Sequence, residues 1–438
     1  MPPRPRSGSR AQPPRAHSSR ARQPSSQGYP WQWLQLATEL LEQLWQMQRP
    51  ADVVISQFLR QHQAKGAMRT WLAETCYGVL RSGLRLQASY PDANTRLLVL
   101  AYLQQQQALP EAWQQRLKPH ELQRLAAPQK LAAHQQAALP EWLWQRLQHQ
   151  PQVNWHAFGQ SCQQRPSLDL RLNPLFQQER DALVKSLHQV PVKAQATPYS
   201  PIGIRSEPHL AVHELELFKQ GKIEVQDEGS QLLALLCRPQ AGMTVVDFCA
   251  GAGGKTLLLG ALMQSKGRLI AMDIEPRRLN NLKPRLQRSG LSNVQPVLIK
   301  NEQDTAVKRL RDKADVVLVD APCSGTGTLR RNPDLKWRIQ PDHLPRLCQT
   351  QASILSQAAK LVKVGAELVY STCSVLVEEN QAQIDAFLQA HPHFQQVPIQ
   401  QRLDELNIPL SSSDPGLLLL PQIHHTDGFF VAILKRIA

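Results

Sequence analysis

Short apolar strand candidates alternate with helical stretches over the second half of the chain, and this alternation restricts the fold more than any other feature. The strand candidates cover residues 244–248, 268–272, 294–299, 315–319, 367–371 and, near the C-terminus, 428–434. Helical stretches at 256–263, 276–287 and 345–362 separate most of them. Such alternation predicts an α/β domain over residues 241–438, built on a doubly wound and mostly parallel sheet.

Residues 29–150 have the pattern of helices. Apolar residues recur at helical spacing between Trp33 and Leu44, and polar residues lie between them. The stretch from Met68 to Arg81 repeats this pattern. We therefore expect an N-terminal all-α domain.

A mixed segment at residues 160–240 joins the helical part to the α/β part. Residues 168–172 alternate as a strand does, and residues 178–187 have helical spacing. Several prolines interrupt the remainder of the segment. This pattern predicts a small α+β subdomain.

The first 28 residues are rich in Arg, Pro and Ser and contain no acidic side chain. Because such a segment cannot bury enough apolar surface to fold, we expect a disordered basic arm at 1–28. The whole chain has 50 Lys and Arg against 35 Asp and Glu, a formal net charge of +15. That charge suits a polyanion such as nucleic acid, although a basic enzyme without such a partner is an alternative.

The seven cysteines include no CxxC pair. An odd number of cysteines in a chain of this length argues against a disulfide scaffold and against a zinc site, so we expect no metal. Free thiols indicate a reducing compartment, and the N-terminus has no apolar core of a secretory signal. No apolar run reaches the roughly 20 residues that cross a membrane. We expect a cytoplasmic protein.

A glycine-rich loop at residues 247–256 follows the first strand of the α/β domain. Glycines at this place let the backbone approach a ligand closely. A phosphate-binding loop would need glycine where the chain has Cys249, and a dinucleotide loop would need it at Thr256. Asp273, after the second strand, can accept hydrogen bonds from both ribose hydroxyls. Of the three classes of site, this feature excludes only the phosphate-binding loop. Nicotinamide dinucleotide and S-adenosylmethionine (SAM) remain as alternatives at this point.

Two cysteines follow neighbouring strands at the edge of the sheet where ligands bind. Cys323 comes after the fourth strand and Cys373 after the fifth, so we expect both thiols to face one cleft. A thiolate that adds to C6 of a cytosine makes C5 nucleophilic enough to take a methyl group. Asp320 is placed to share a proton with N3 of the base, and the second thiol can assist release.

The remaining cysteines have a simpler interpretation, because a buried cysteine usually behaves as a small apolar side chain. We apply this interpretation to Cys76, Cys162, Cys237 and Cys348. Cys249 lies in the glycine loop, where we expect it to line the cofactor pocket through its backbone.

Several motifs, in order and at matching spacing, resemble the RsmB/Nop/Sun (Fmu) family of RNA 5-methylcytosine methyltransferases. They are residues 247–256, residues 320–327, and residues 371–374 with Glu378-Glu379-Asn380. The resemblance covers about residues 165–438 and implies a Rossmann-like class I SAM methyltransferase sheet. It makes Cys373 the nucleophile and Cys323 the residue that assists release.

The resemblance also implies the cofactor site. SAM would contact the loop residues Cys249, Ala250, Gly251, Ala252, Gly253, Gly254 and Lys255. Asp273 would hold the ribose, and Asp320 would lie between cofactor and base, with Lys255 pointing into the site. Two positions depart from the family pattern: Ala252 stands where proline is common, and Asn301 where an aspartate would contact the adenine. An amide can still hydrogen-bond the ring, so Asn301 stays a candidate contact.

The N-terminal helices, around residues 73–81, are similar to a NusB-like RNA-binding domain, and residues 170–173 resemble a small RNA-recognition-like subdomain. These likenesses imply methyl transfer from SAM to C5 of a cytosine in RNA, with 16S rRNA of the small ribosomal subunit as substrate. We also expect a monomer. The alternatives are a tRNA substrate, a non-catalytic NusB-like RNA-binding protein, and a nicotinamide-dependent oxidoreductase.

Overall fold

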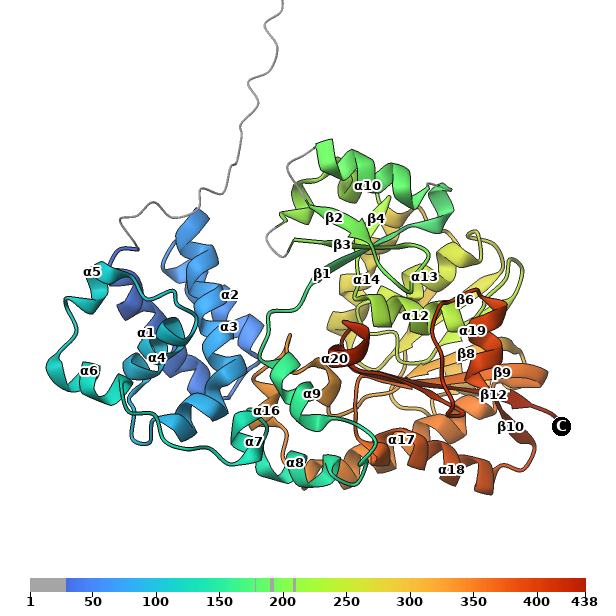
Figure 1. Ribbon diagram of the computed structural model, residues 1–438. Helices are drawn as coiled ribbons and strands as arrows, with labels where there is room; N and C mark the ends of the chain where they lie inside the picture. The colour runs from blue at the N-terminus through green and yellow to red at the C-terminus, as the bar shows by residue number, and fades with distance from the viewer. Residues whose placement is uncertain (1–28, 178, 190–192, 208–209) are drawn as a thin grey trace, which may run out of the picture.

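The computed structural model describes residues 29–177, 179–189, 193–207 and 210–438 (Figure 1). The basic arm expected at 1–28 lies outside the described residues. In Figure 1 a group of helices at the N-terminal end lies beside a large α/β unit, and a small sheet sits on top of that unit. The fold class expected from the sequence is confirmed.

The α/β unit contains an eight-stranded sheet in the order β10-β12-β9-β8-β5-β6-β7, and β11 pairs with β12. The strands are β5 (Thr244–Asp247), β6 (Arg268–Asp273), β7 (Val294–Leu298), β8 (Ala314–Asp320), β9 (Val362–Thr372), β10 (Phe394–Val397), β11 (Leu417–Leu419) and β12 (Phe429–Arg436). The five strands from β9 to β7 are parallel, whereas β12 runs antiparallel to both β9 and β10. Chain order reverses between β5 and β8, and open α/β sheets bind ligands at such a reversal.

Helices cover both faces of this sheet (Figure 1). The helices of this unit are α12 (Glu228–Leu236), α13 (Gly254–Leu262), α14 (Pro276–Ser289), α15 (Thr305–Lys308), α16 (Leu335–Arg338), α17 (His343–Ala359), α18 (Gln381–Ala390), α19 (Ile399–Glu405) and α20 (Pro421–His424). Of these, α16 and α20 lie against the N-terminal helices. Alternate strand residues point to opposite faces: Val246 and Val317 pack with α17 and α18, whereas Val245 and Val316 pack with α12 and α13. Burial on both faces explains why these strands are almost continuously apolar.

The expected helix at 345–362 is shifted in the structure, because α17 spans His343–Ala359. Pro345 therefore lies in the first turn, where the missing N–H removes no helical hydrogen bond. The strand expected at 367–371 extends back to Val362, which pairs with Ala314 beyond an irregularity in the ladder. A left-handed residue, Gly365, interrupts the apolar pattern and hides this extension in the sequence.

The N-terminal helices form two groups with separate apolar cores. The first group is α1 (Gln32–Trp45), α2 (Ala51–Gln61), α3 (Gly66–Ser89), α4 (Thr95–Gln105), α5 (Glu111–Gln114) and α6 (Pro119–Leu125). The second group is α7 (Ala133–Gln136), α8 (Glu141–Leu147) and α9 (Trp155–Cys162). The second group packs against Leu329, Leu344 and Leu420 of the α/β unit, so it joins the helical part to the sheet.

The small sheet has the order β2-β3-β1-β4, and its pairs are antiparallel. Its elements are β1 (Leu168–Leu172), η1 (Pro174–Phe176), α10 (Arg180–Gln189), β2 (Ala194–Ala196), β3 (Gly203–Ser206), η2 (Val212–Glu214), α11 (Glu216–Lys219) and β4 (Ile223–Val225). Leu170 and Ile204 of the sheet pack with Leu183 and Leu187 of α10 in one core. The small sheet is therefore an α+β unit joined to the large sheet through α12.

Among the helices in the described ranges, none combines the length and the apolar character that spanning a bilayer requires.

Candidate active site

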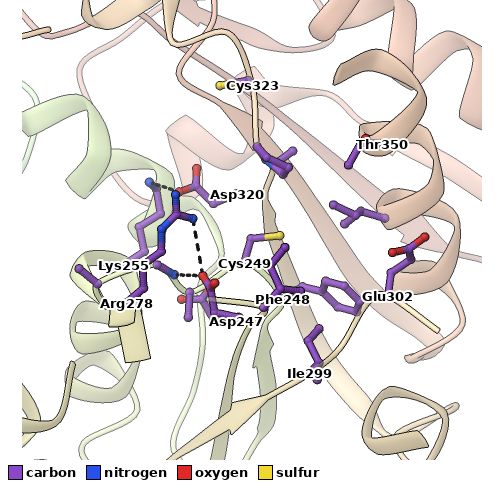
Figure 2. A pocket seen from close by; sticks show the side chains of 18 of the residues that line it. Asp247, Phe248, Cys249, Lys255, Arg278, Ile299, Glu302, Asp320, Cys323 and Thr350 are labelled. Carbon is purple, nitrogen blue, oxygen red and sulfur yellow. Dashed lines mark hydrogen bonds and ion pairs between the residues drawn. The ribbon is translucent and has the colours of Figure 1, made fainter. Parts of the chain in front are cut away.

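A cavity of about 540 Å³ lies at the reversal point of the large sheet. The glycine loop after β5 forms one wall, and residues at the ends of β6, β7, β8 and β9 form the others. Both Cys323 and Cys373 line this cavity, together with Asp273, Asn301 and Asp320. The structure therefore brings together side chains from four strand ends that the sequence predicted to meet there. Figure 2 shows part of this lining.

Two glycines give the loop its shape. Gly251 and Gly253 have positive φ angles of 56° and 86°, a conformation that side chains other than glycine rarely adopt. A Cβ atom on Gly253 would lie 2.1 Å from Cδ1 of Leu282 in α14. The Gly251 N–H donates to Oδ2 of Asp273 over 2.8 Å. This hydrogen bond ties the loop to the end of β6. Helix α13 begins directly after the loop, at Gly254 on the cavity wall.

The variant Gly253→Ala is expected to lower stability more than Gly242→Ala does. Both positions have positive φ, but a Cβ atom at Gly242 would meet nothing within 4 Å. Strain in the left-handed region costs about 1–2 kcal/mol, which both variants share. Only Gly253→Ala adds the collision with Leu282, so its free energy of unfolding should fall further and SAM affinity should fall with it. Chemical denaturation and calorimetric titration measure the two effects; equal losses in both variants would contradict this account of the loop.

Asp273 is buried and lies at the end of β6. Besides Gly251, its carboxylate accepts a hydrogen bond from the Glu275 N–H over 2.7 Å, and each oxygen keeps a lone pair for another donor. Asn301 lies on the cavity wall beside Ile299, and its Oδ1 accepts from the Gln303 N–H over 2.9 Å. Its amide N–H₂ group stays available to a ring nitrogen. Both positions fit the contacts that were expected of them.

Asp247 also lines the cavity, although the sequence did not identify it as a site residue. One carboxylate oxygen, Oδ2, accepts from the Thr256 hydroxyl over 2.6 Å, but the buried Oδ1 has no hydrogen-bond partner. Burial raises the pKa of Asp247 to about 7, and the nearby Asp320 adds to this effect. A buried carboxylate with an open oxygen suits a cationic ligand group. The position at the end of β5 was the available signal in the sequence.

Lys255 and Asp320, which both line the cavity, form an ion pair, and Figure 2 shows the two side chains pointing toward each other. The Lys255 Nζ atom donates to Asp320 Oδ2 over 2.8 Å, and the Ser371 hydroxyl donates to Oδ1 over 3.1 Å. Burial acts to lower the pKa of Lys255, but the adjacent Asp320 carboxylate outweighs it and the pKa is raised. Lys255 is therefore held as an ammonium group beside the Asp320 carboxylate.

The two thiols are in direct contact. The Sγ atoms of Cys323 and Cys373 lie 3.3 Å apart, and all seven cysteines are free. The hydrogen bond to Cys373, followed by burial, raises the pKa of Cys323 well above its usual value. Cys323 therefore holds its proton more tightly than a free thiol does, and the geometry allows either sulfur to donate to the other. The contact places both sulfur atoms together on the wall of the cavity.

The other cysteines differ from this pair. Cys76, Cys162 and Cys237 are completely buried, which agrees with their interpretation as apolar side chains. The half-buried Cys348 thiol donates to the Glu378 carbonyl over 3.4 Å. Cys249 lines the cavity, but burial raises its pKa well above the usual value, so it is a poor nucleophile.

Comparison with known proteins gives the family. The model of the 16S rRNA methyltransferase RsmB/F family matches residues 234–435, and that of the RsmF/B-like ferredoxin-like domain matches residues 139–213. The chain is 36% identical over 311 residues to the probable ribosomal RNA small subunit methyltransferase B of Synechocystis sp., a match that covers 70% of this chain and 69% of that protein. The chain belongs to the RsmB/F methyltransferase family.

Other relatives agree with this assignment. Ribosomal RNA small subunit methyltransferase B of Yersinia pseudotuberculosis is 36% identical over 68% of this chain and 66% of its own length. The crystal structure of PH0851 has a TM-score of 0.76 and 25% identity, and covers 93% of this chain and 99% of its own. The structure of NSun6 from Pyrococcus horikoshii with SFG shares the fold, with a TM-score of 0.59 and 20% identity over 69% of this chain and 99% of its own.

As a member of the RsmB/F methyltransferase family, the chain uses SAM as its cofactor. The cavity fits such a molecule in its chemistry: a glycine loop admits close approach, Asp273 presents a carboxylate to a diol, and Asp247 holds a buried oxygen without a partner. A nicotinamide-dependent oxidoreductase is thereby excluded as the class of enzyme.

Proposed function

We propose that the chain methylates C5 of a cytosine in RNA, through a covalent bond between Cys373 Sγ and C6 of the base. The proposed substrate is 16S rRNA of the small ribosomal subunit, as the names of the relatives suggest. One observation carries the proposal: two thiols 3.3 Å apart share a cavity with the Lys255–Asp320 ion pair. Neither a dinucleotide enzyme nor a binding module needs a sulfur pair beside a proton donor.

The first step is attack of the Cys373 thiolate on C6. A new S–C6 bond forms and the electron density moves toward C5 and N3. The proton that N3 takes comes from the Lys255 ammonium group, relayed through the Asp320 carboxylate, which accepts from Lys255 across 2.8 Å. When bound, SAM supplies an electrophilic methyl group to C5. Asp247, Asp273 and the glycine loop would hold the cofactor for this transfer.

Release of the product requires removal of the C5 proton. Once Cys373 is bonded to carbon, it no longer accepts from Cys323, and the main cause of the raised pKa of Cys323 is gone. Cys323 then loses its proton to water and, as a thiolate, takes the C5 proton. The S–C6 bond breaks, the proton on N3 returns through Asp320 to Lys255, and the ion pair regains its starting state. One proton leaves per methyl group transferred, so the cycle is balanced.

The rest of the chain would present the RNA. We propose that the helical part at 29–150 and the small α+β unit at 160–240 grip the RNA, with the basic arm at 1–28 adding electrostatic attraction. Chemistry on a base requires that the base leave its stack, so a grip on both sides of the cavity is useful. We further propose that the protein acts as a monomer in the cytoplasm.

The affinity for SAM is expected to rise between pH 5.5 and 7.5 in the wild type. The Asp247 carboxyl, with a pKa of about 7, is protonated at the low end of this range and ionised at the high end. The ionised form attracts a cationic cofactor, so the dissociation constant should fall as the pH increases. Asp247→Asn should bind more weakly and lose this dependence. Calorimetric titration over the range measures both; a wild-type affinity that is flat with pH would contradict the role of Asp247.

A methyl-transfer assay tests the proposed function. The full chain is mixed with methyl-labelled SAM and unmodified 16S rRNA, and the RNA is digested to nucleosides. Label in 5-methylcytidine supports the reaction and the substrate. Label with tRNA but not with 16S rRNA would keep the chemistry and change the substrate. Binding of SAM with no labelled nucleoside from any RNA would favour a non-catalytic RNA-binding protein instead.

A further inference from the structure

Glu379 is a completely buried carboxylate directly behind the two cysteine loops. It ends η4 (Val377–Glu379), the short turn that follows the Cys373 segment. No step of the proposed reaction uses it. An ionisable side chain at such a position is costly to bury unless hydrogen bonds satisfy it.

Four donors converge on this carboxylate. Oε1 accepts from the Ser324 N–H over 2.8 Å and from Gln351 Nε2 over 3.0 Å. Oε2 accepts from the hydroxyls of Ser324 and Ser374, each over 2.5 Å. Ser324 directly follows Cys323, and Ser374 directly follows Cys373. The same side chain thus holds the residue next to each thiol.

The carboxylate is itself held in place by the β9 side of the site. The Tyr370 hydroxyl donates to the Glu379 carbonyl over 2.7 Å. The neighbouring Asn380 donates to the Ser374 carbonyl over 2.9 Å and accepts from the Thr372 hydroxyl over 2.5 Å. Because these hydrogen bonds hold Glu379 in place, its carboxylate can fix the spacing between the Cys323 and Cys373 loops.

We propose that Glu379 is a positioning residue that sets the distance and orientation of the Cys323–Cys373 thiol pair. This inference rests on the proposed function, because the pair matters only if the sulfurs take part in the reaction. Without the carboxylate, the loop after β8 and the loop after β9 lose their common acceptor. The sulfur atoms then move relative to each other, and a shift of about 1 Å in a reacting group can lower a rate about 100-fold.

Glu379→Gln is the principal variant, and Glu378→Gln is its matched control. Gln keeps the size of the side chain but places an N–H₂ group where one oxygen accepted, so it faces donors with a donor. Glu378 is the adjacent residue, with the same chemistry, but its carboxylate is partly exposed and pairs with Arg146 over 2.5 Å instead of the cysteine loops. Both variants remove one negative charge, but only Glu379→Gln removes a carboxylate that accepts hydrogen bonds from the cysteine loops.

Three measurements separate positioning from mere folding support. In Glu379→Gln we expect kcat to fall about 100-fold, whereas KM for RNA and the dissociation constant of SAM stay within about twofold. Cross-linking of Cys323 to Cys373 by a bifunctional thiol reagent, quantified by peptide mass spectrometry, should fall at least about fivefold. Labelling of each thiol by a monofunctional reagent should persist. Glu378→Gln should match the wild type in all three.

A second variant covers the case in which Glu379→Gln does not fold. Ser374→Ala removes one of the four donors and keeps the carboxylate, so kcat should fall about tenfold and cross-linking should fall in parallel. A folded Glu379→Gln or Ser374→Ala protein with wild-type kcat and wild-type cross-linking would overturn the inference. A wild-type protein that forms no 5-methylcytidine would instead overturn the proposed function, so the two failures are distinguishable.

Discussion

Replacement of Cys373 by alanine is expected to abolish methyl transfer while SAM binding stays nearly unchanged. The proposed first step needs the Cys373 sulfur, and Cys323, whose Sγ lies 3.3 Å away on the loop after β8, is assigned to proton removal and not to attack on C6. Loss of the covalent nucleophile in other enzymes lowers turnover by several orders of magnitude, so we expect a fall of at least about 10⁴-fold in kcat. The glycine loop and Asp273, which the variant leaves intact, would carry the cofactor contacts.

Cys348→Ala is the matched control for that variant. Cys348 is a free cysteine near Glu378, and its thiol donates to the Glu378 backbone carbonyl. Cys348 does not line the cavity. It should retain wild-type turnover. Cys373→Ala with normal turnover would remove the nucleophile assignment, and a parallel loss of SAM affinity would indicate that the cavity itself had changed.

Replacement of Cys323 by alanine should have the opposite signature, in which the covalent complex forms but is not released. Addition to C6 needs Cys373, Asp320 and Lys255, all of which remain. Removal of the C5 proton loses its base, and a positioned base typically contributes about 10²–10⁴-fold. The RNA–protein adduct should therefore accumulate when SAM and RNA are both present. A band that survives denaturing electrophoresis and disappears after digestion with ribonuclease would report it.

The double variant Cys323→Ala/Cys373→Ala provides the control, because it should form no such band. If Cys323→Ala forms no adduct under any condition and turns over at the wild-type rate, then Cys323 has no part in release. An adduct in the double variant would place the covalent bond on another residue.

The pattern of strands and helices predicted the core of the fold because its information is local. Strands such as β6 and β8 are buried on both faces and appear as apolar runs, and each ends at the polar residue that enters the cavity, Asp273 or Asp320. Since parallel strands end at one edge, placing Cys323 and Cys373 after neighbouring strands was enough to predict that they share a cleft.

The contacts between separate parts of the chain were not predictable, because they join residues that are distant in the sequence. The buried Lys336 donates to the Arg81 carbonyl across 255 positions, and Trp337 packs against Trp45 in the core of the N-terminal helices. Burial lowers the pKa of Lys336 to about 8, and no local sequence pattern predicts this shift. The hydrogen bonds to the Glu379 carboxylate likewise depend on a turn, a helix and two loops that come together in the folded chain.

The most direct test of the account traps the covalent bond itself. RNA that carries 5-fluorocytidine at the target position can accept the thiol at C6 and the methyl group at C5, but fluorine cannot leave as the proton does, so the adduct stays. The full chain is incubated with this RNA and SAM, digested with protease and ribonuclease, and analysed by mass spectrometry. The account predicts a methylated nucleotide bonded to Cys373. A bond to Cys323, or methyl transfer to unmodified cytosine with no trapped adduct on the fluorinated RNA, would contradict it.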